Sequence, residues 1–579
     1  MWLSKLVVPT SLAYVVFSVI LQLVHGATLS KTLARDKTLA STDSRQPRAL
    51  DLYEASIIEL QSGLQNGHFT SVDLVKVYFA RISQVNHAGP KLNAILETNP
   101  RALNQAHALD EERKHTGPRS VLHGIPILVK DSIATLASDG MNTTAGSYAL
   151  LGSVVRGEAT VVAKLRQAGA IILGKTNLCE WSHARGNLPN GWSARGGQTK
   201  NPYYPNSDPC GSSSGSAVAV AIGLAAGSLG AETDGSIVCP ASYNNIEVGE
   251  HMWVFMRLDT NPKLQVIPMS SHQDTVGPLT RSVADGAAIL SIIAGRDERD
   301  NFTSTTSSLI PDYTQFLDPG AIRGKRFGVP RKVFTNETLM NTHTSVNVEF
   351  DKALDRIRKL GGVIVDPADF PSAEEMSYKQ EEVIAMVQFK IGLNAYIKDL
   401  VSVPTGVSSF ADIIAFNNAN KDLEQPEGLI FAESTTGYNS TYHQVLSQNQ
   451  NLARDRGIDA VLKLHKLDAL LLPANLHTAL PAAMAGYPTV TVPLGFHPND
   501  TKPFPETQAP HQVLYPAPGM PFGLSFIGTA YTEPSLIGFA YAYEQYTRTR
   551  LKRRAYKEAV PTIQFDDIIG KSERGSVDF

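Results

Sequence analysis

One lysine and two serines stand in short segments whose composition suits nucleophilic catalysis. Lys130 directly follows the apolar run 125–129, so we expect it to be half-buried, where the neutral and basic form of its amine is accessible. Ser212 lies in the Gly/Ser-rich loop 211–216, and Ser236 follows the tripeptide Thr-Asp-Gly. A serine hydroxyl needs a base to become a nucleophile, and a desolvated lysine can supply that base. The three residues are therefore candidates for one catalytic group.

Each segment also has an ordinary interpretation when it is taken alone. The loop 211–216 could cradle a phosphate at the start of the following helix, although it lacks the lysine that a Walker loop has before its last serine, or it could be a flexible turn. The segment around Ser236 could be a simple turn, although a glycine beside a serine allows the sharp turn that an oxyanion hole needs. Neither serine stands in Gly-x-Ser-x-Gly, so a histidine-based α/β-hydrolase is not indicated.

In their order and spacing, the three segments resemble the amidase signature family. That family combines Gly-Ile-Pro-x-x-x-Lys-Asp with a Gly-Ser-Ser-Gly-Gly-Ser-like loop and a Gly-Gly-Ser-Ile segment, and the 24-residue separation of Ser212 and Ser236 matches its spacing. The likeness spans roughly residues 55–548. Further matching stretches lie at 143–147, 168–177, 273–278, 485–488, 523–526 and 541–545.

The resemblance implies a hydrolase that cleaves a small-molecule carboxylic amide to an acid and an amine or ammonia. Ser236 would attack the carbonyl carbon and form an acyl-enzyme, Ser212 would relay the proton, and Lys130 would be the base. Ser212 would follow a cis peptide bond, and no metal or organic cofactor would be needed. The backbone N–H groups expected around the oxyanion are those of Thr233, Asp234, Gly235 and Ser236.

Two departures from the family pattern bear on activity. Asp234 and Val238 stand where the family usually has a glycine and an arginine, and Asp234 would add a negative charge beside an anionic intermediate. The stretch 247–265 replaces the expected continuation Gly-Ile-Lys-Pro-Thr with a bulky apolar run. Because Gly249 and Glu250 can be encoded by codons that contain the intron-donor-like GTGAG, we hypothesise that 247–265 is a retained intron or a mispredicted exon.

Short apolar runs alternate with helical patterns along the chain, which predicts an α/β domain. The resemblance implies one large domain, 51–550, with a central mixed β-sheet covered by helices. Residues 334–459 are interpreted as a helical insertion, and 551–579 as a C-terminal tail. We expect strands at 125–129, 170–173, 469–472, 489–493 and 523–527, and helices at 55–65, 71–84, 100–114, 217–226, 348–360 and 382–398.

The N-terminus predicts a secreted protein. In residues 1–26, Lys5 precedes an apolar run and a cleavage site after Gly26, which is the layout of a signal peptide, although an uncleaved membrane anchor would look the same. Residues 27–50 are polar and predict a flexible leader. The net charge of -3 disfavours nucleic acid and anionic membrane surfaces as partners. Candidate N-glycosylation sites are Asn142, Asn301, Asn336, Asn439 and Asn499.

The three cysteines are too few for a disulfide scaffold. Buried inert thiols are one interpretation for each of Cys179, Cys210 and Cys239, and a bridge between Cys210 and Cys239 is the other. The odd number leaves at least one thiol unpaired or paired with another chain.

Two alternative functions are compatible with the same motifs. One is the glutamine-dependent amidotransferase subunit that converts misacylated transfer RNA, although the signal segment argues against that intracellular role. The other is a catalytically impaired secreted glycoprotein that keeps the fold and has lost turnover through the change at 247–265.

Overall fold

The computed structural model describes residues 50–186, 188–250, 265–297, 310–335, 343–424, 428–505 and 512–569. The predicted signal segment 1–26 and nearly all of the leader 27–50 lie outside these ranges. Within them, no helix combines the length and the apolar character that a membrane crossing requires.

A mixed β-sheet of 11 strands runs through the described part of the chain, in the order β1-β3-β2-β6-β8-β7-β12-β13-β11-β9-β10. Strand β2 pairs in parallel with β3 and β6, strand β9 pairs in parallel with β10 and β11, and the other neighbours are antiparallel. The predicted α/β class with a mixed sheet is confirmed. The strands are β1 (Ile95–Thr98), β2 (Pro126–Lys130), β3 (Ile171–Thr176), β6 (Gly227–Glu232), β7 (Glu247–Glu250), β8 (Thr275–Thr280), β9 (Arg326–Gly328), β10 (Val363–Val365), β11 (Ala469–Ala474), β12 (Thr489–Phe496) and β13 (Pro521–Ile527), with β4 (Trp192–Ser193) and β5 (Gly197–Gln198) forming a separate hairpin.

Helices from both halves of the chain pack against this sheet, among them α4 on β3, α8 on β7 and α17 on β12. The helices are α2 (Ile57–Gln65), α3 (Ser71–Val85), α4 (Ala102–Thr116), α5 (Thr160–Gln167), α6 (Ser214–Ala221), α7 (Val238–Tyr243), α8 (Val283–Ile293), α9 (Arg331–Thr335), α10 (Thr344–Lys359), α11 (Tyr378–Asp399), α12 (Phe410–Ala419), α13 (Ile430–Ser434), α14 (Ser440–Gln450), α15 (Asp459–His465), α16 (Leu476–Ala485), α17 (Glu533–Thr547) and α18 (Phe565–Ile569).

The sequence predicted the start of helix α3 correctly and misplaced the bounds of helix α6. Helix α3 begins after Thr70, whose side chain accepts from the N–H of Asp73 while the Asp73 carboxylate accepts from the N–H of Thr70, as the sequence predicted. The small-residue helix predicted at 217–226 instead spans Ser214–Ala221. It ends there because Gly223 adopts a φ of +70°, which turns the chain toward β6.

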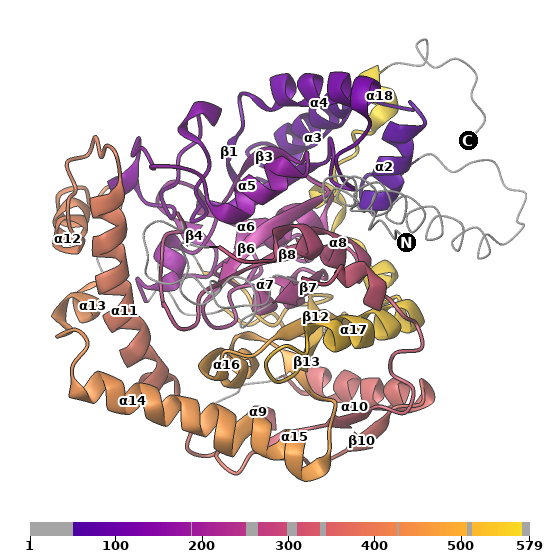
Figure 1. Cartoon of the computed structure of the whole chain (residues 1–579), viewed down its shortest axis with the longest axis vertical. Coiled ribbons are helices and arrows are strands. Elements are labelled where there is room, and N and C mark those ends of the chain that lie inside the picture. Colours follow the sequence, from indigo (N-terminus) through magenta and orange to yellow (C-terminus); the bar gives the residue numbers. More distant parts are fainter. Residues whose placement is uncertain are drawn as a thin grey trace, which may run out of the picture. The chain divides into compact units, whose positions relative to one another are not determined.

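The predicted helical insertion 334–459 is partly a continuation of the sheet. Strand β10 lies within it and pairs with β9, and α10 packs on β11 and β12. The helical block outside the sheet therefore begins at α11, which contacts α12, α13 and α14 (orange in Figure 1).

A buried ion cluster joins this helical block to the rest of the body. Arg185 lies 2.9 Å from Glu424, which follows α12, and also pairs with Glu180. Ser147 Oγ and the Tyr148 N–H each donate to Glu424 at 2.8 Å. Burial raises the pKa of Glu180 to about 8. Removal of one partner would leave an uncompensated buried charge, so the cluster fixes Glu424 against Arg185.

The C-terminal part, predicted as a tail, belongs to the folded body as far as Ile569. Arg81 in α3 donates to the carbonyl oxygen of Ile563 at 2.6 Å. The ring of Phe565 stacks on Phe69, with the ring centroids 4.2 Å apart. These contacts tie residues near the C-terminus to the first helices of the chain.

The first residues of the unusual stretch 247–265 form β7, between β8 and β12, and 251–264 lie outside the described residues. Glu247 is only 2% exposed, and among the described residues its Oε2 has no hydrogen-bond partner. Burial, and secondarily the nearby Glu544, raise its pKa well above the usual range. An unsatisfied buried polar group costs about 1–3 kcal/mol, so Glu247 is a poor fit to a central strand.

We expect the dominant mature transcript to lack the codons of 247–265. The physical reason is the unsatisfied Glu247 carboxyl, which is out of place in a central strand. Sequencing of complementary DNA tests this expectation. Finding the codons of 247–265 in the dominant messenger would refute the hypothesis.

Candidate active site

Strand pairing brings Lys130 and the turn that carries Ser236 to the same edge of the sheet. Lys130 is the last residue of β2, which pairs in parallel with β6. Ser236 lies in the turn between β6 and α7, and Ser212 lies two residues before α6. Because parallel strands end at the same sheet edge, the predicted lysine and serine meet there.

The Lys130 amine is enclosed and bonded to Ser212. Its Nζ donates to Ser212 Oγ and to the carbonyl oxygen of Ala231, both at 2.7 Å. The residue is 0% exposed, and burial lowers the pKa of Lys130 to about 8. The burial is more complete than the half-burial expected from the sequence. A lysine with this pKa is partly neutral near pH 8, so it can accept a proton.

The backbones of the two serine segments are held side by side. The Ser213 N–H donates to the Ser236 carbonyl oxygen at 3.0 Å, and Ser213 Oγ donates to Ala231 O at 3.0 Å. The peptide bond between Gly211 and Ser212 is cis, as the resemblance implied. Ser236 is 6% exposed, so the site is nearly enclosed.

Glu232, which sequence reasoning did not assign a role, organises the turn of Ser236. Its carboxylate accepts from the N–H of Gly235 at 2.6 Å, of Val238 at 2.8 Å, and of Ile237. No local sequence pattern marks this contact, because Glu232 lies six residues before α7, outside the usual capping position.

One of the four N–H groups predicted for the oxyanion hole is therefore occupied. The Gly235 N–H donates to Glu232, whereas among the described residues those of Thr233, Asp234 and Ser236 have no protein acceptor. Gly235 has a φ of +82°, and a Cβ added there would lie 3.1 Å from the backbone of Leu476. A glycine is required at this point of the turn.

The surroundings of Asp234 act against its negative charge. Burial raises the pKa of Asp234 well above the usual range, and the nearby Glu381, Glu232 and Asp274 raise it further. These effects favour the neutral carboxyl. The departure from the family's glycine therefore adds less negative charge beside the nucleophile than the sequence suggested.

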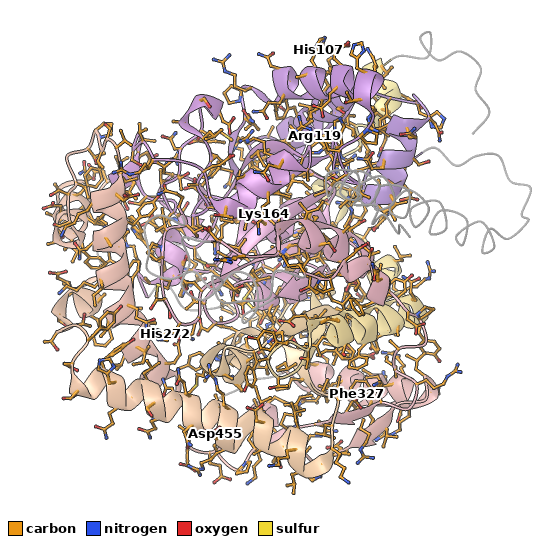
Figure 2. The ribbon with its side chains drawn as sticks, viewed as in Figure 1. His107, Arg119, Lys164, His272, Phe327 and Asp455 are labelled. Atoms are coloured by element: carbon orange, nitrogen blue, oxygen red, sulfur yellow. A yellow bond between two sulfur atoms is a disulfide. The ribbon has the colours of Figure 1, made fainter. Side chains whose placement is uncertain are left out.

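The loop before β8 connects this turn to α11. Thr233 Oγ1 donates to Asp274 at 2.6 Å, and burial raises the pKa of Asp274 to about 6. Gln273 donates to Glu381 of α11 at 2.9 Å. His272, labelled in Figure 2, is hydrogen-bonded to an amide side chain of the same helix. The family-like stretch 273–278 thus links the nucleophile turn to the helical block.

Cys210 and Cys239 form a disulfide, whereas Cys179 is free and buried. Of the two interpretations of the cysteines, the bridge is therefore the one found. Within the described ranges, no three His, Cys, Asp or Glu side chains are grouped so that they could hold a metal ion.

Known proteins resemble this chain over most of its length. The sequence pattern of the amidase family matches residues 73–537. A relative from Arabidopsis thaliana, named a probable amidase, is 39% identical over 525 residues, which cover 88% of this chain and 93% of that protein. The native peptide amidase of Stenotrophomonas maltophilia is 39% identical, with a TM-score of 0.76 over 89% of this chain and 100% of its own.

One component of the glutamyl-tRNA(Gln) amidotransferase of Myxococcus xanthus is more distant, at 30% identity over 539 residues, or 86% of this chain and 98% of that protein. The family match and the closer likeness to amidases agree with the geometry of the lysine and the serines. The chain belongs to the amidase family and is an enzyme that hydrolyses the C–N bond of carboxylic amides.

Proposed function

We propose that hydrolysis proceeds through an acyl-enzyme on Ser236, with Ser212 as the proton relay and Lys130 as the base. The observation that carries this proposal is the 2.7 Å hydrogen bond between a buried lysine, whose pKa is lowered to about 8, and the Ser212 hydroxyl. A neutral lysine can accept the proton that a serine must lose to become a nucleophile.

The proton transfers in this mechanism need no group besides the two serines, the lysine, the substrate and water. Ser236 Oγ attacks the amide carbon while its proton passes to Ser212, whose own proton passes to Lys130. The N–H groups of Thr233, Asp234 and Ser236 would stabilise the oxyanion, at about 3 kcal/mol per donor. The amine then leaves with the proton from Lys130. Water attacks the acyl-enzyme, its proton follows the same path, and Ser236 regains its hydrogen.

We infer that peptide amides are the first substrates to test. The likeness to the peptide amidase supports this choice, because it covers the whole of that chain at 39% identity. The amidotransferase function is disfavoured by the lower identity of that relative and by the N-terminal pattern of this chain. The intact contacts of Lys130 and Ser212 favour an active enzyme over a catalytically impaired one.

A fluorophosphonate probe should label the wild-type enzyme and should not label Ser236→Ala. Ser212→Ala and Lys130→Ala should each lower the rate of amide hydrolysis by orders of magnitude, and the double variant should lose little more because the residues act as one unit. Gel fluorescence and product release measure the two effects. Ser408→Ala, at an exposed serine outside the three motifs, is the control and should label normally. Labelling that survives Ser236→Ala would exclude this nucleophile.

We expect kcat/KM for a peptide amide to rise with pH through about 8, because only neutral Lys130 is a base. Below that value the rate should fall about tenfold per pH unit. The free energy of unfolding should also rise between about pH 8 and 10.5, since the unfolded lysine, with its pKa of 10.5, holds more protons than the folded one there. Rate profiles and urea titrations from about pH 6 to about pH 10 measure both. A rate that is flat across about pH 8 would contradict the role of Lys130.

We also propose that the protein is secreted and glycosylated. The N-terminal pattern supports export, and a disulfide is typical of an oxidising compartment. Asn439 and Asn499 are exposed. Asn142 is half-buried, and its amide donates to Glu97 at 2.8 Å, so it is a poorer acceptor. The candidates Asn301 and Asn336 lie outside the described residues.

Expression in a host that glycosylates secreted proteins should place the protein in the medium with glycans at Asn439 and Asn499. Asn439→Gln and Asn499→Gln should each reduce the apparent mass before treatment with a glycan-removing enzyme, and Asn142→Gln should leave it unchanged, because only the first two side chains are exposed. Electrophoresis and mass spectrometry of the medium check this. Retention of an unmodified chain in the cytosol would refute the proposal.

A further inference from the structure

The disulfide joins the loop of the relay serine to the helix that follows the nucleophile. Cys210 lies two residues before Ser212, and Cys239 lies three residues after Ser236, in α7. Both cysteines are buried in an apolar cluster with Tyr243, Ala517 and Met520. The bridge is thus a covalent connection between the two chain segments whose relative position decides whether the serines can exchange a proton.

Cys210 has a backbone conformation that its surroundings must hold. Its φ of +54° lies in the left-handed region, which residues other than glycine rarely adopt. Its N–H donates to Asp208 at 2.7 Å, its carbonyl oxygen accepts from Ser214 Oγ at 2.5 Å, and its sulfur is bonded to Cys239. Loss of the bridge would remove one of these three restraints immediately before Gly211 and Ser212.

The other end of the bridge is fixed to the nucleophile turn. The Cys239 N–H donates to the Gly235 carbonyl oxygen at 2.9 Å, directly before Ser236. Asn244, which follows α7, donates to the carbonyl oxygen of Pro209 at 2.9 Å, directly before Cys210. The disulfide and this hydrogen bond therefore form two parallel connections between α7 and the relay loop.

We propose that the bridge between Cys210 and Cys239 positions Ser212 against Ser236, so that without it the enzyme stays folded but turns over slowly. The inference rests on the roles proposed above for Ser212 and Ser236. Its physical basis is that proton transfer needs hydrogen-bond distances, and a displacement of about 1 Å at a reacting group can cost about a hundredfold in rate. The cysteines touch no reacting atom and act through the serines.

The third cysteine takes no part in the bridge. Cys179 contacts the same loop, since a Cβ added at Gly211 would lie 2.1 Å from its sulfur. Burial raises the pKa of Cys179 to about 11, and its sulfur accepts from the Gly191 N–H at 3.0 Å. A thiol with this pKa is a poor nucleophile toward disulfides, so Cys179 does not compete for the bridge.

The test compares the double variant Cys210→Ala/Cys239→Ala with Phe565→Ala. Phe565→Ala removes the ring stack on Phe69 and is the control for lost stability. The denatured, unreduced wild type should show one free thiol. For each variant, kcat is divided by the amount of site that a fluorophosphonate titrates, at a temperature where circular dichroism shows a folded protein.

We expect kcat per titrated site to fall at least about tenfold in the double variant, with KM changed less than about threefold. Phe565→Ala should keep the wild-type kcat per titrated site, even where its melting temperature falls. If the double variant does not fold, Cys210→Ala/Cys239→Val, which refills the apolar space, replaces it under the same criteria.

Wild-type kcat per titrated site in the folded double variant would overturn the proposal. Three free thiols in the wild type would do so as well, and failure of both double variants to fold would assign the bridge to folding and not to positioning. None of these outcomes concerns the nucleophile itself. Labelling that persists in Ser236→Ala would refute the proposed function whatever the bridge does, so the two failures can be told apart.

Discussion

The burial of the Lys130 amine against the Ser212 hydroxyl is the constraint on which the rest of the site depends. An ammonium ion without water is costly, so enclosure shifts the lysine toward its neutral form. The enclosure is supplied by the sheet, because β2 runs between β3 and β6 and is buried along its whole length. The hydrogens of the amine are taken up by Ser212 Oγ and Ala231 O. The core of the fold therefore sets the basicity of the site as well as its shape.

Acidic residues near the turn of Ser236 partly offset the lowering of the Lys130 pKa by burial. Glu232 and Asp274 raise the pKa of Lys130, so they offset part of the lowering caused by burial. The negative charge of each residue is either reduced by a shift toward the protonated carboxyl or stabilised by hydrogen-bond donors. Burial raises the pKa of Asp274 to about 6, and Glu232 accepts three backbone N–H groups of the turn. Hydrogen bonds to a carboxylate are roughly twice as strong as neutral ones, so the same acids that tune the lysine also fix the turn of Ser236.

The parts of the fold that the sequence predicted are those with a local signal. The apolar run before Lys130 indicated a buried strand, and Thr70 with Asp73 marked the start of α3. Helix α6 was misplaced because all of its small residues are buried, so no apolar periodicity marks its bounds. Strand β10 has three residues, too few for any alternation to show. The hydrogen bond of the Gly235 N–H was not predicted because it depends on the direction of the Glu232 side chain. The packing of the C-terminal residues was not predicted because their contacts join positions that are hundreds of residues apart.

Residues of α11 and α16 pack against the turn that carries Ser236. Tyr378, the first residue of α11, donates to the carbonyl oxygen of Leu476 at 2.9 Å, and Leu476 lies against Gly235. Glu381 of α11 is among the groups that raise the pKa of Asp234. The helical block is held on the body by the buried pairing of Arg185 with Glu424. The reaction depends on residues within shared motifs, whereas the shape of the neighbouring surface depends on α11 and α16. The turn of Ser236 is therefore bounded by the packing of that block as well as by its own motif.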